Sequence, residues 1–189
     1  MFAPRAAYRR LVAEPRPPGA LTVVRRPALA ALVIGGAIAL TSTGGATPQA
    51  LATTTLCWCF VPGVQLIVAA ALLALWRRPG LRLGVAIDLL FAGQGPWLLW
   101  TLWVAAWALV AFRVGDHTTP RLWFILSFAL IPLGWTAIIL VAFCREVLGL
   151  AAWRALLWMS LYELAIWSLA YLYAGGMTFQ AWPFGQIRL

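Results

Sequence analysis

The chain has 189 residues, of which 63% are hydrophobic and 10% are charged, and its mean hydropathy is +0.89. A soluble domain of this size could not cover so much apolar surface, so the composition excludes that class and predicts one polytopic, all-α membrane domain. The net charge of +9 does not indicate nucleic-acid binding, because the fourteen basic residues lie between apolar runs. All fourteen are arginine, a bias that we interpret as genomic and that favours a bacterial inner membrane as the location.

The first 26 residues form a basic segment that we assign to the cytoplasm. Within it, residues 4–14 can form a short helix with Tyr8 and Leu11 on one face and arginines on another. Such a helix can lie on an anionic membrane surface. The alternative is a frayed tail whose charges only set the topology.

Five apolar runs follow, each long enough to cross a bilayer as a helix. We predict transmembrane helices at about 27–43, 51–76, 83–112, 122–143 and 151–174, followed by an aromatic outer tail over 175–189. In the first of them, Ala31, Gly35 and Ala39 recur every fourth residue. This small-residue face lets another helix approach closely.

The second and third predicted spans contain helix-breaking residues near mid-membrane. Pro62-Gly63 predicts a kink in the second span. Gly93-Gln94-Gly95-Pro96 interrupts the third span, and freed backbone groups at this depth are tolerated only where protein or trapped water covers them. We therefore expect the third span to be buried among other helices.

Arginine placement predicts the orientation of the chain. With a cytoplasmic N-terminus, eleven arginines flank the inner ends of the five spans and three flank the outer ends. Basic residues stay on the cytoplasmic side, so the sequence predicts the N-terminus inside and the C-terminus outside.

Polar residues recur at one depth inside the predicted bundle. Glu163, Gln94, Gln65 and Pro132 each lie about 11 or 12 residues from the inner end of their span. A carboxylate at the bilayer centre costs about 2.5–3.5 kcal/mol, so Glu163 is expected to face other helices. We predict a mid-membrane polar layer in which Glu163 meets the two glutamines and carbonyls freed by the prolines.

Two interpretations of this layer remain open. The side chains can simply satisfy one another and hold the helices in register, or they can form part of a proton or ion pathway. Asp88 lies closer to the inner surface, and we predict that it forms a structural ion pair with the inner arginines, with Arg82 as the candidate partner.

Twelve tryptophans are present, and Trp97, Trp100, Trp135 and Trp167 are expected to lie deep in the membrane. Three tryptophans follow the spacing of a single helix face: Trp100, Trp103 and Trp107. Deep aromatic residues at this spacing are typical of packing against a partner helix or a lipid tail. A bound lipid, quinone or pigment against this face is an alternative, and no other cofactor and no metal is predicted.

The N-terminal residues Phe2-x-Pro4, Tyr8-Arg9-Arg10 and Pro15 stand ahead of five closely spaced helices. In this arrangement the chain resembles a small bacterial member of the Yip family of membrane proteins. The resemblance implies a five-span fold with a cytoplasmic N-terminus. Eukaryotic members of that family act in membrane traffic, and the resemblance transfers no functional residue to this chain.

The sequence contains no Walker loop, no G-x-S-x-G, no H-E-x-x-H and no paired catalytic carboxylates. We therefore expect a non-enzymatic scaffold or accessory subunit that contacts other transmembrane subunits within the lipid bilayer. The alternative is a small oligomeric transporter or channel that uses the Glu163 and glutamine layer. A membrane-embedded enzyme acting on a lipid or quinone is the third possibility.

Overall fold

The computed structural model describes residues 3–13, 20–43, 47–76, 78–114 and 128–179. About 90% of these residues are helical and none is in a strand, which confirms the all-α prediction for the described part of the chain. Three helical segments there are long and apolar enough to cross a membrane: Val23–Thr41, Pro48–Trp76 and Leu83–Trp107. They coincide with the first three predicted spans.

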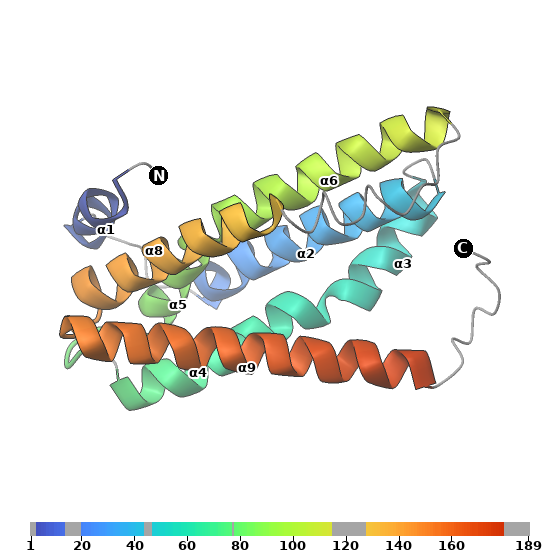
Figure 1. Ribbon diagram of the computed structural model, residues 1–189. Coiled ribbons are helices and arrows are strands. Elements are labelled where there is room, and N and C mark those ends of the chain that lie inside the picture. Colours follow the sequence, from blue (N-terminus) through green and yellow to red (C-terminus); the bar gives the residue numbers. More distant parts are fainter. Residues whose placement is uncertain (1–2, 14–19, 44–46, 77, 115–127, 180–189) are drawn as a thin grey trace.

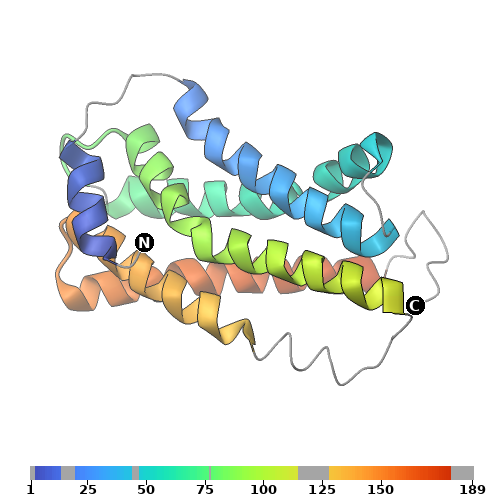
Figure 2. The ribbon, with the colours of Figure 1, turned by 90° about the horizontal axis from the view of Figure 1, so that it is seen from above.

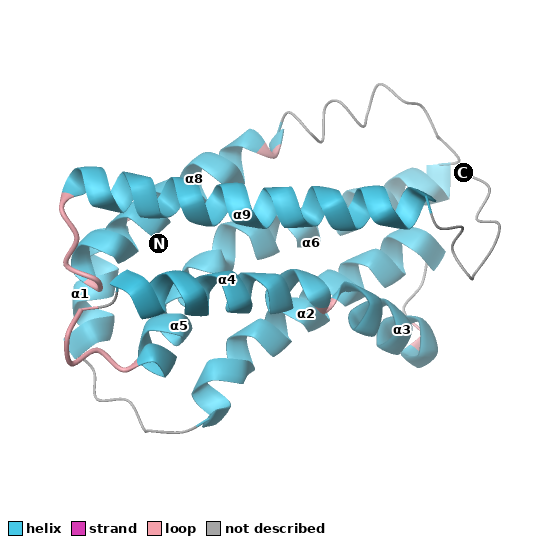
Figure 3. Ribbon diagram, turned by 90° about the horizontal axis from the view of Figure 1, so that it is seen from below, coloured by secondary structure: helices cyan, strands magenta, loops and turns pink. Residues whose placement is uncertain are grey.

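The helices form an elongated bundle (Figure 1). In chain order they are α1 (Pro4–Ala13), α2 (Ala20–Thr43), α3 (Pro48–Trp58), α4 (Phe60–Trp76), α5 (Leu83–Phe91), the 3-10 turn η1 (Ala92–Gln94), α6 (Gly95–Val114), α8 (Leu130–Glu146) and α9 (Ala152–Phe179). The passes α2, α3–α4, α5–α6, α8 and α9 alternate in direction along the bundle, and α1 lies at the end where α5 and α9 begin (Figures 1 and 2). Helices α4 and α9 pack along one face (Figure 3).

Two prolines place the breaks within the second and third passes. Pro62 has no N–H to bond the carbonyl of Trp58, and α3 ends at that residue, one turn before the predicted kink. In the same way Pro96 cannot bond the carbonyl of Ala92, and the chain there tightens into η1. Both helices are therefore interrupted where a proline lacks the backbone N–H that would bond the carbonyl four residues earlier.

Several helix ends differ from the predicted span ends. Helix α2 begins at Ala20 rather than near residue 27, because Arg25 and Arg26 set a membrane boundary but are good helix formers. Helix α9 continues past Gly175 to Phe179, since a glycine in a helix costs only about 1 kcal/mol. The residues before 128 in the predicted fourth span, and Trp182 in the tail, lie outside the described residues.

The short helix predicted near residues 4–14 is present as α1, and it packs against α8 of the same chain. Tyr8 is fully buried, and its ring meets that of Phe143 edge-on at 5.7 Å between centroids. A Cβ on Gly93 would lie 2.8 Å from the Tyr8 hydroxyl, so the glycine leaves room for this side chain. The Nε of Arg5 also donates to Glu146 Oε1 at 2.6 Å. Burial raises the pKa of Tyr8 above its usual value of about 10, so the phenol stays neutral.

The core is concentrated at the end of the bundle that carries α1. Its largest fully buried side chains there are Trp158, Tyr8, Tyr162 and Phe143. Large apolar side chains elsewhere face outward, and Leu56, Ile67 and Leu75 on α3 and α4 are 73%, 70% and 75% exposed. Such a surface suits hydrocarbon rather than water.

Candidate functional site

A half-open cavity of about 290 Å³ lies between α2, α3–α4, α6 and α9, and Trp167 in its wall is 51% exposed. It is lined by apolar, aromatic and a few polar side chains, and the predicted polar residues Glu163, Gln94 and Gln65 are all among them. The described lining residues are Ala30, Ile34, Trp58, Val61, Gln65, Gln94, Trp97, Leu98, Trp100, Thr101, Tyr162, Glu163, Ile166 and Trp167. The structure therefore brings the three residues of the predicted layer to one site.

The backbone breaks help to place the two glutamines. Gln94 is the last residue of η1 and is 5% exposed, so the 3-10 turn before Pro96 positions it. Gln65 lies on α4, just beyond the break at Cys59 and Pro62. The 3-10 turn thus supplies one amide group of the cavity, and helix α4 supplies the other.

Glu163 lies near the middle of α9 and is half-buried. The indole N–H of Trp167, one turn later on the same helix, donates to Glu163 Oε2 at 3.1 Å. No arginine is among the described residues that line the cavity, so no guanidinium balances the carboxylate there. A carboxylate in this position can be balanced by a bound proton or by a cationic ligand.

Two further polar groups of the lining have no hydrogen-bond partner in the described part of the chain. They are the indole N–H of Trp100 and the hydroxyl of Tyr162, and both atoms are buried. Buried Tyr and Trp polar groups usually find a partner. Because both atoms are enclosed by protein, they are not presented to a ligand in the cavity.

Aromatic rings form much of the cavity wall. The ring of Trp97 meets that of Trp100 edge-on at 5.5 Å and that of Trp167 at 5.8 Å. Tyr162 is stacked on Trp158 at 5.4 Å. Aromatic faces beside a carboxylate attract organic cations through cation–π and ionic contacts.

Sequence reasoning recognised Trp97 and Trp167 only as deep aromatic residues, and it missed Tyr162. The contact between Glu163 and Trp167 could have been predicted from their spacing, because residues i and i+4 are neighbours on a helix. The presence of Tyr162 in the same cavity could not be predicted from its position next to Glu163, since adjacent residues on a helix point about 100° apart.

Pro132 does not line this cavity, so the prediction that it belongs to the polar layer was wrong. It lines a second space of about 250 Å³ between α6 and α8, together with Trp100, Trp103, Phe128 and Trp135. The number of residues from the inner end of a span predicts the depth of a residue but not the side of the helix that it faces. Pro132 lies on the other side of α6 from the cavity. Trp103 packs against Phe128 of the same chain at 5.8 Å, while Trp107 lines neither space.

The small-residue face of α2 is occupied within the chain. Ala31 and Ala39 are buried, and Gly35 lies against the backbone of Thr55 on α3. The hydroxyl of Thr54 donates to the Gly35 carbonyl at 2.7 Å. This face therefore mediates internal helix packing, and it is not open to the separate subunit that the sequence-based interpretation allowed.

Asp88 pairs with Arg26 of α2 rather than with the predicted Arg82. The Nε of Arg26 lies 3.0 Å from Asp88 Oδ1, and its Nη1 donates to the Asp88 carbonyl at 3.0 Å. Arg82 is the N-cap residue of α5, and its side chain makes no capping hydrogen bond. Sequence distance favoured Arg82, but helix packing brings Arg26 closer.

We expect Asp88→Asn to destabilise the protein by about 1–3 kcal/mol, because it removes the charge that pairs with the half-buried Arg26. Unfolding of the detergent-solubilised chain by sodium dodecyl sulfate would measure the change. Arg82→Gln is the matched control and should change stability by less than about 0.5 kcal/mol. Equal effects of the two substitutions would contradict the assigned pair.

No family model, no curated protein and no solved structure matches this chain, so the geometry of the cavity is what bears on its function.

Proposed function

We propose that this chain crosses the bacterial inner membrane five times, with its N-terminus in the cytoplasm and its C-terminus outside. The alternating passes of the bundle support this topology (Figure 1). Helix α9 has 28 residues and a length of about 42 Å, which exceeds the roughly 30 Å of a hydrocarbon core. All but one of the described arginines belong to the end that carries α1, and the exception is Arg113, in the last turn of α6 at the other end. The arginines at the α1 end are Arg5, Arg9, Arg10, Arg25, Arg26, Arg78, Arg82, Arg145 and Arg154.

A reporter fused after Leu189 tests this topology. Alkaline phosphatase is active only outside the cytoplasm, and we expect the fusion to be active, whereas green fluorescent protein at the same position should not fluoresce. The reverse pattern would overturn the proposed topology, because either the orientation or the odd number of spans would then be wrong.

We also propose that the protein is a small transporter for amphiphilic organic cations, which bind in the cavity beside Glu163. The observation that carries this proposal is the single cavity that joins an unbalanced carboxylate, two amides and several aromatic rings. In a low-dielectric site an uncompensated carboxylate is costly, and a cation of the right size removes that cost.

Each part of the lining has a distinct role in this proposal. Glu163 supplies the opposite charge, and the faces of Trp97 and Trp167 supply cation–π contacts worth about 0.5–2 kcal/mol each. Gln65 and Gln94 offer amide oxygens to a polar end of the ligand. Five helices enclose little space, so we expect transport to require an oligomer, and no chemical step on the cation is involved.

The test uses the full chain and a small probe cation, benzyltrimethylammonium. Isothermal titration calorimetry in detergent should show saturable binding of this cation and none of benzenesulfonate, an anion of similar size. Proteoliposomes that contain the protein should then take up the labelled cation faster than empty liposomes. Equal binding of the two probes would overturn the proposal, as would equal uptake.

A second candidate is the accessory subunit of a larger membrane complex. The observation that favours it is the outward face of α6, where Leu99 and Trp103 are 68% and 41% exposed. Purification in mild detergent followed by mass spectrometry would support this candidate if a second membrane protein is recovered in equal amount.

A further inference from the structure

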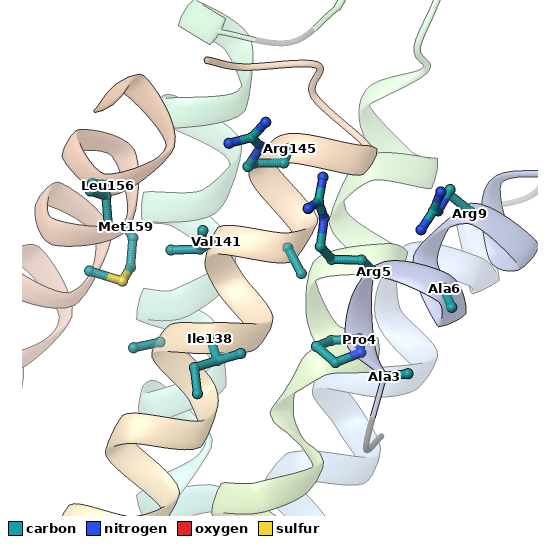
Figure 4. Close-up of a pocket in the computed structure, with 12 residues that line it drawn as sticks. Ala3, Pro4, Arg5, Ala6, Arg9, Ile138, Val141, Arg145, Leu156 and Met159 are labelled. Atoms are coloured by element: carbon teal, nitrogen blue, oxygen red, sulfur yellow. The ribbon is translucent and has the colours of Figure 1, made fainter. Parts of the chain in front are cut away.

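A groove lies over α8 between α1 and α9 (Figure 4), and it shares no described lining residue with the cavity around Glu163. Its volume is about 770 Å³. The side chain of Val141 on α8 points toward Met159 on α9, and Ile138 and Leu156 also line the groove (Figure 4). Ile138 and Leu156 are 61% and 52% exposed, so the floor of the groove is apolar and uncovered.

Three arginines form one end of the same groove, Arg5 and Arg9 on α1 and Arg145 on α8 (Figure 4). Glu146 partly balances them, with Arg5 Nε at 2.6 Å and Arg9 Nε at 3.7 Å from its carboxylate oxygens. The side chains of Arg5 and Arg9 are still 58% and 68% exposed. Among the described residues, three guanidinium groups against one carboxylate leave this end positively charged.

Along α8, the charged end of the groove and its apolar floor follow one another, with the charge nearer the end of the helix. Ile138, Val141 and Arg145 lie at i, i+3 and i+7, so they share one face of the helix over about 10 Å. Arg145 is in the last turn of α8, at the end of the bundle that carries α1, and Ile138 is two turns deeper. This order places cations at the membrane surface and apolar side chains within the hydrocarbon.

We propose that the groove binds an anionic phospholipid of the cytoplasmic leaflet. The phosphate lies between Arg5 and Arg145, and one acyl chain lies along Ile138, Val141 and Met159. Arginines near a membrane surface attract anionic lipids, and the exposed apolar floor gives the chain a surface to pack against. A lipid held in this way contacts α1, α8 and α9 together and supports the position of α1. This proposal does not depend on the transport function.

Native mass spectrometry of the full chain in detergent tests the proposal, with dioctanoyl phosphatidylglycerol compared against dioctanoyl phosphatidylcholine. We expect the anionic lipid to bind at least fivefold more tightly. Arg145→Gln should weaken its binding about fivefold, which corresponds to about 1 kcal/mol. Arg154→Gln is the matched control, because Arg154 is at the same end but lies over the Trp153 ring at 5.1 Å, outside the groove.

The acyl chain is tested separately from the headgroup. Ile138→Ser should weaken binding, while Ile67→Ser, at a similarly exposed isoleucine on α4, should leave it within twofold. Glycerol phosphate, which has the anion but no chain, should not compete at the same concentration. The proposal is overturned if the two lipids bind equally, if the two arginine variants behave alike, or if glycerol phosphate binds as tightly as the lipid.

Discussion

Glu163→Gln is expected to weaken the binding of benzyltrimethylammonium by about tenfold to a hundredfold. The substitution keeps the size of the side chain and its ability to accept the N–H of Trp167, but it removes the negative charge. A close charge pair away from water contributes about 1.5–3 kcal/mol, which gives the stated range. Calorimetry on the purified variant would measure the change, and uptake into proteoliposomes should fall with it.

Glu146→Gln provides the matched control for this experiment. It makes the same chemical change in the last turn of α8, where Glu146 contacts Arg5 and does not line the cavity. We expect cation binding to stay within twofold of the original protein. If Glu163→Gln binds the cation normally while it elutes as a folded particle, the carboxylate has no part in recognition and the transport proposal fails.

Gly35→Ala is expected to be the most destabilising single-methyl change in the described part of the chain. An added Cβ would lie 2.5 Å from the Cα of Thr55 and 2.7 Å from its backbone nitrogen. Backbone atoms cannot rotate away as a flexible side chain can, so α2 and α3 must separate. The separation would also lengthen the hydrogen bond from Thr54 to the Gly35 carbonyl. Overpacking of this kind typically costs 1–3 kcal/mol, and we expect about 3 kcal/mol here.

Gly134→Ala tests whether the effect comes from the contact rather than from the glycine itself. Nothing lies within 4 Å of a Cβ at this position on α8. Alanine favours a helix over glycine by about 0.5–1 kcal/mol, so this variant should be as stable as the original protein or slightly more so. Unfolding in sodium dodecyl sulfate would compare the two variants. Similar losses at both positions would show that α2 and α3 are not closely packed at Gly35.

The sequence predicted the helical class and the depth of the polar residues, and the resemblance to the Yip family stays a prediction. Depth could be counted because each helical residue advances by about 1.5 Å. For that reason Glu163, Gln94 and Gln65 were expected at one level, and they line one cavity. The same count placed Pro132 with them, although it lies between α6 and α8, because depth does not determine which way a side chain points.

Partners of individual side chains could not be predicted in the same way. Asp88 pairs with Arg26, which is 62 residues away in the chain, and Tyr8 is buried against Phe143. Both contacts depend on how helices are rotated and which helices are neighbours. Hydropathy gives little information on rotation here, because nearly every face of these helices is apolar.

Composition and residue order by themselves determined that the chain forms apolar helices, where prolines break them and where arginines collect. These properties are local, since they follow from backbone donors, side-chain transfer energies and charge near each residue. Only the tertiary structure decided that the small-residue face of α2 packs on α3, that α1 docks on α8, and that Glu163 shares a cavity with aromatic rings. These features depend on close packing between segments far apart in the chain, which no single segment specifies.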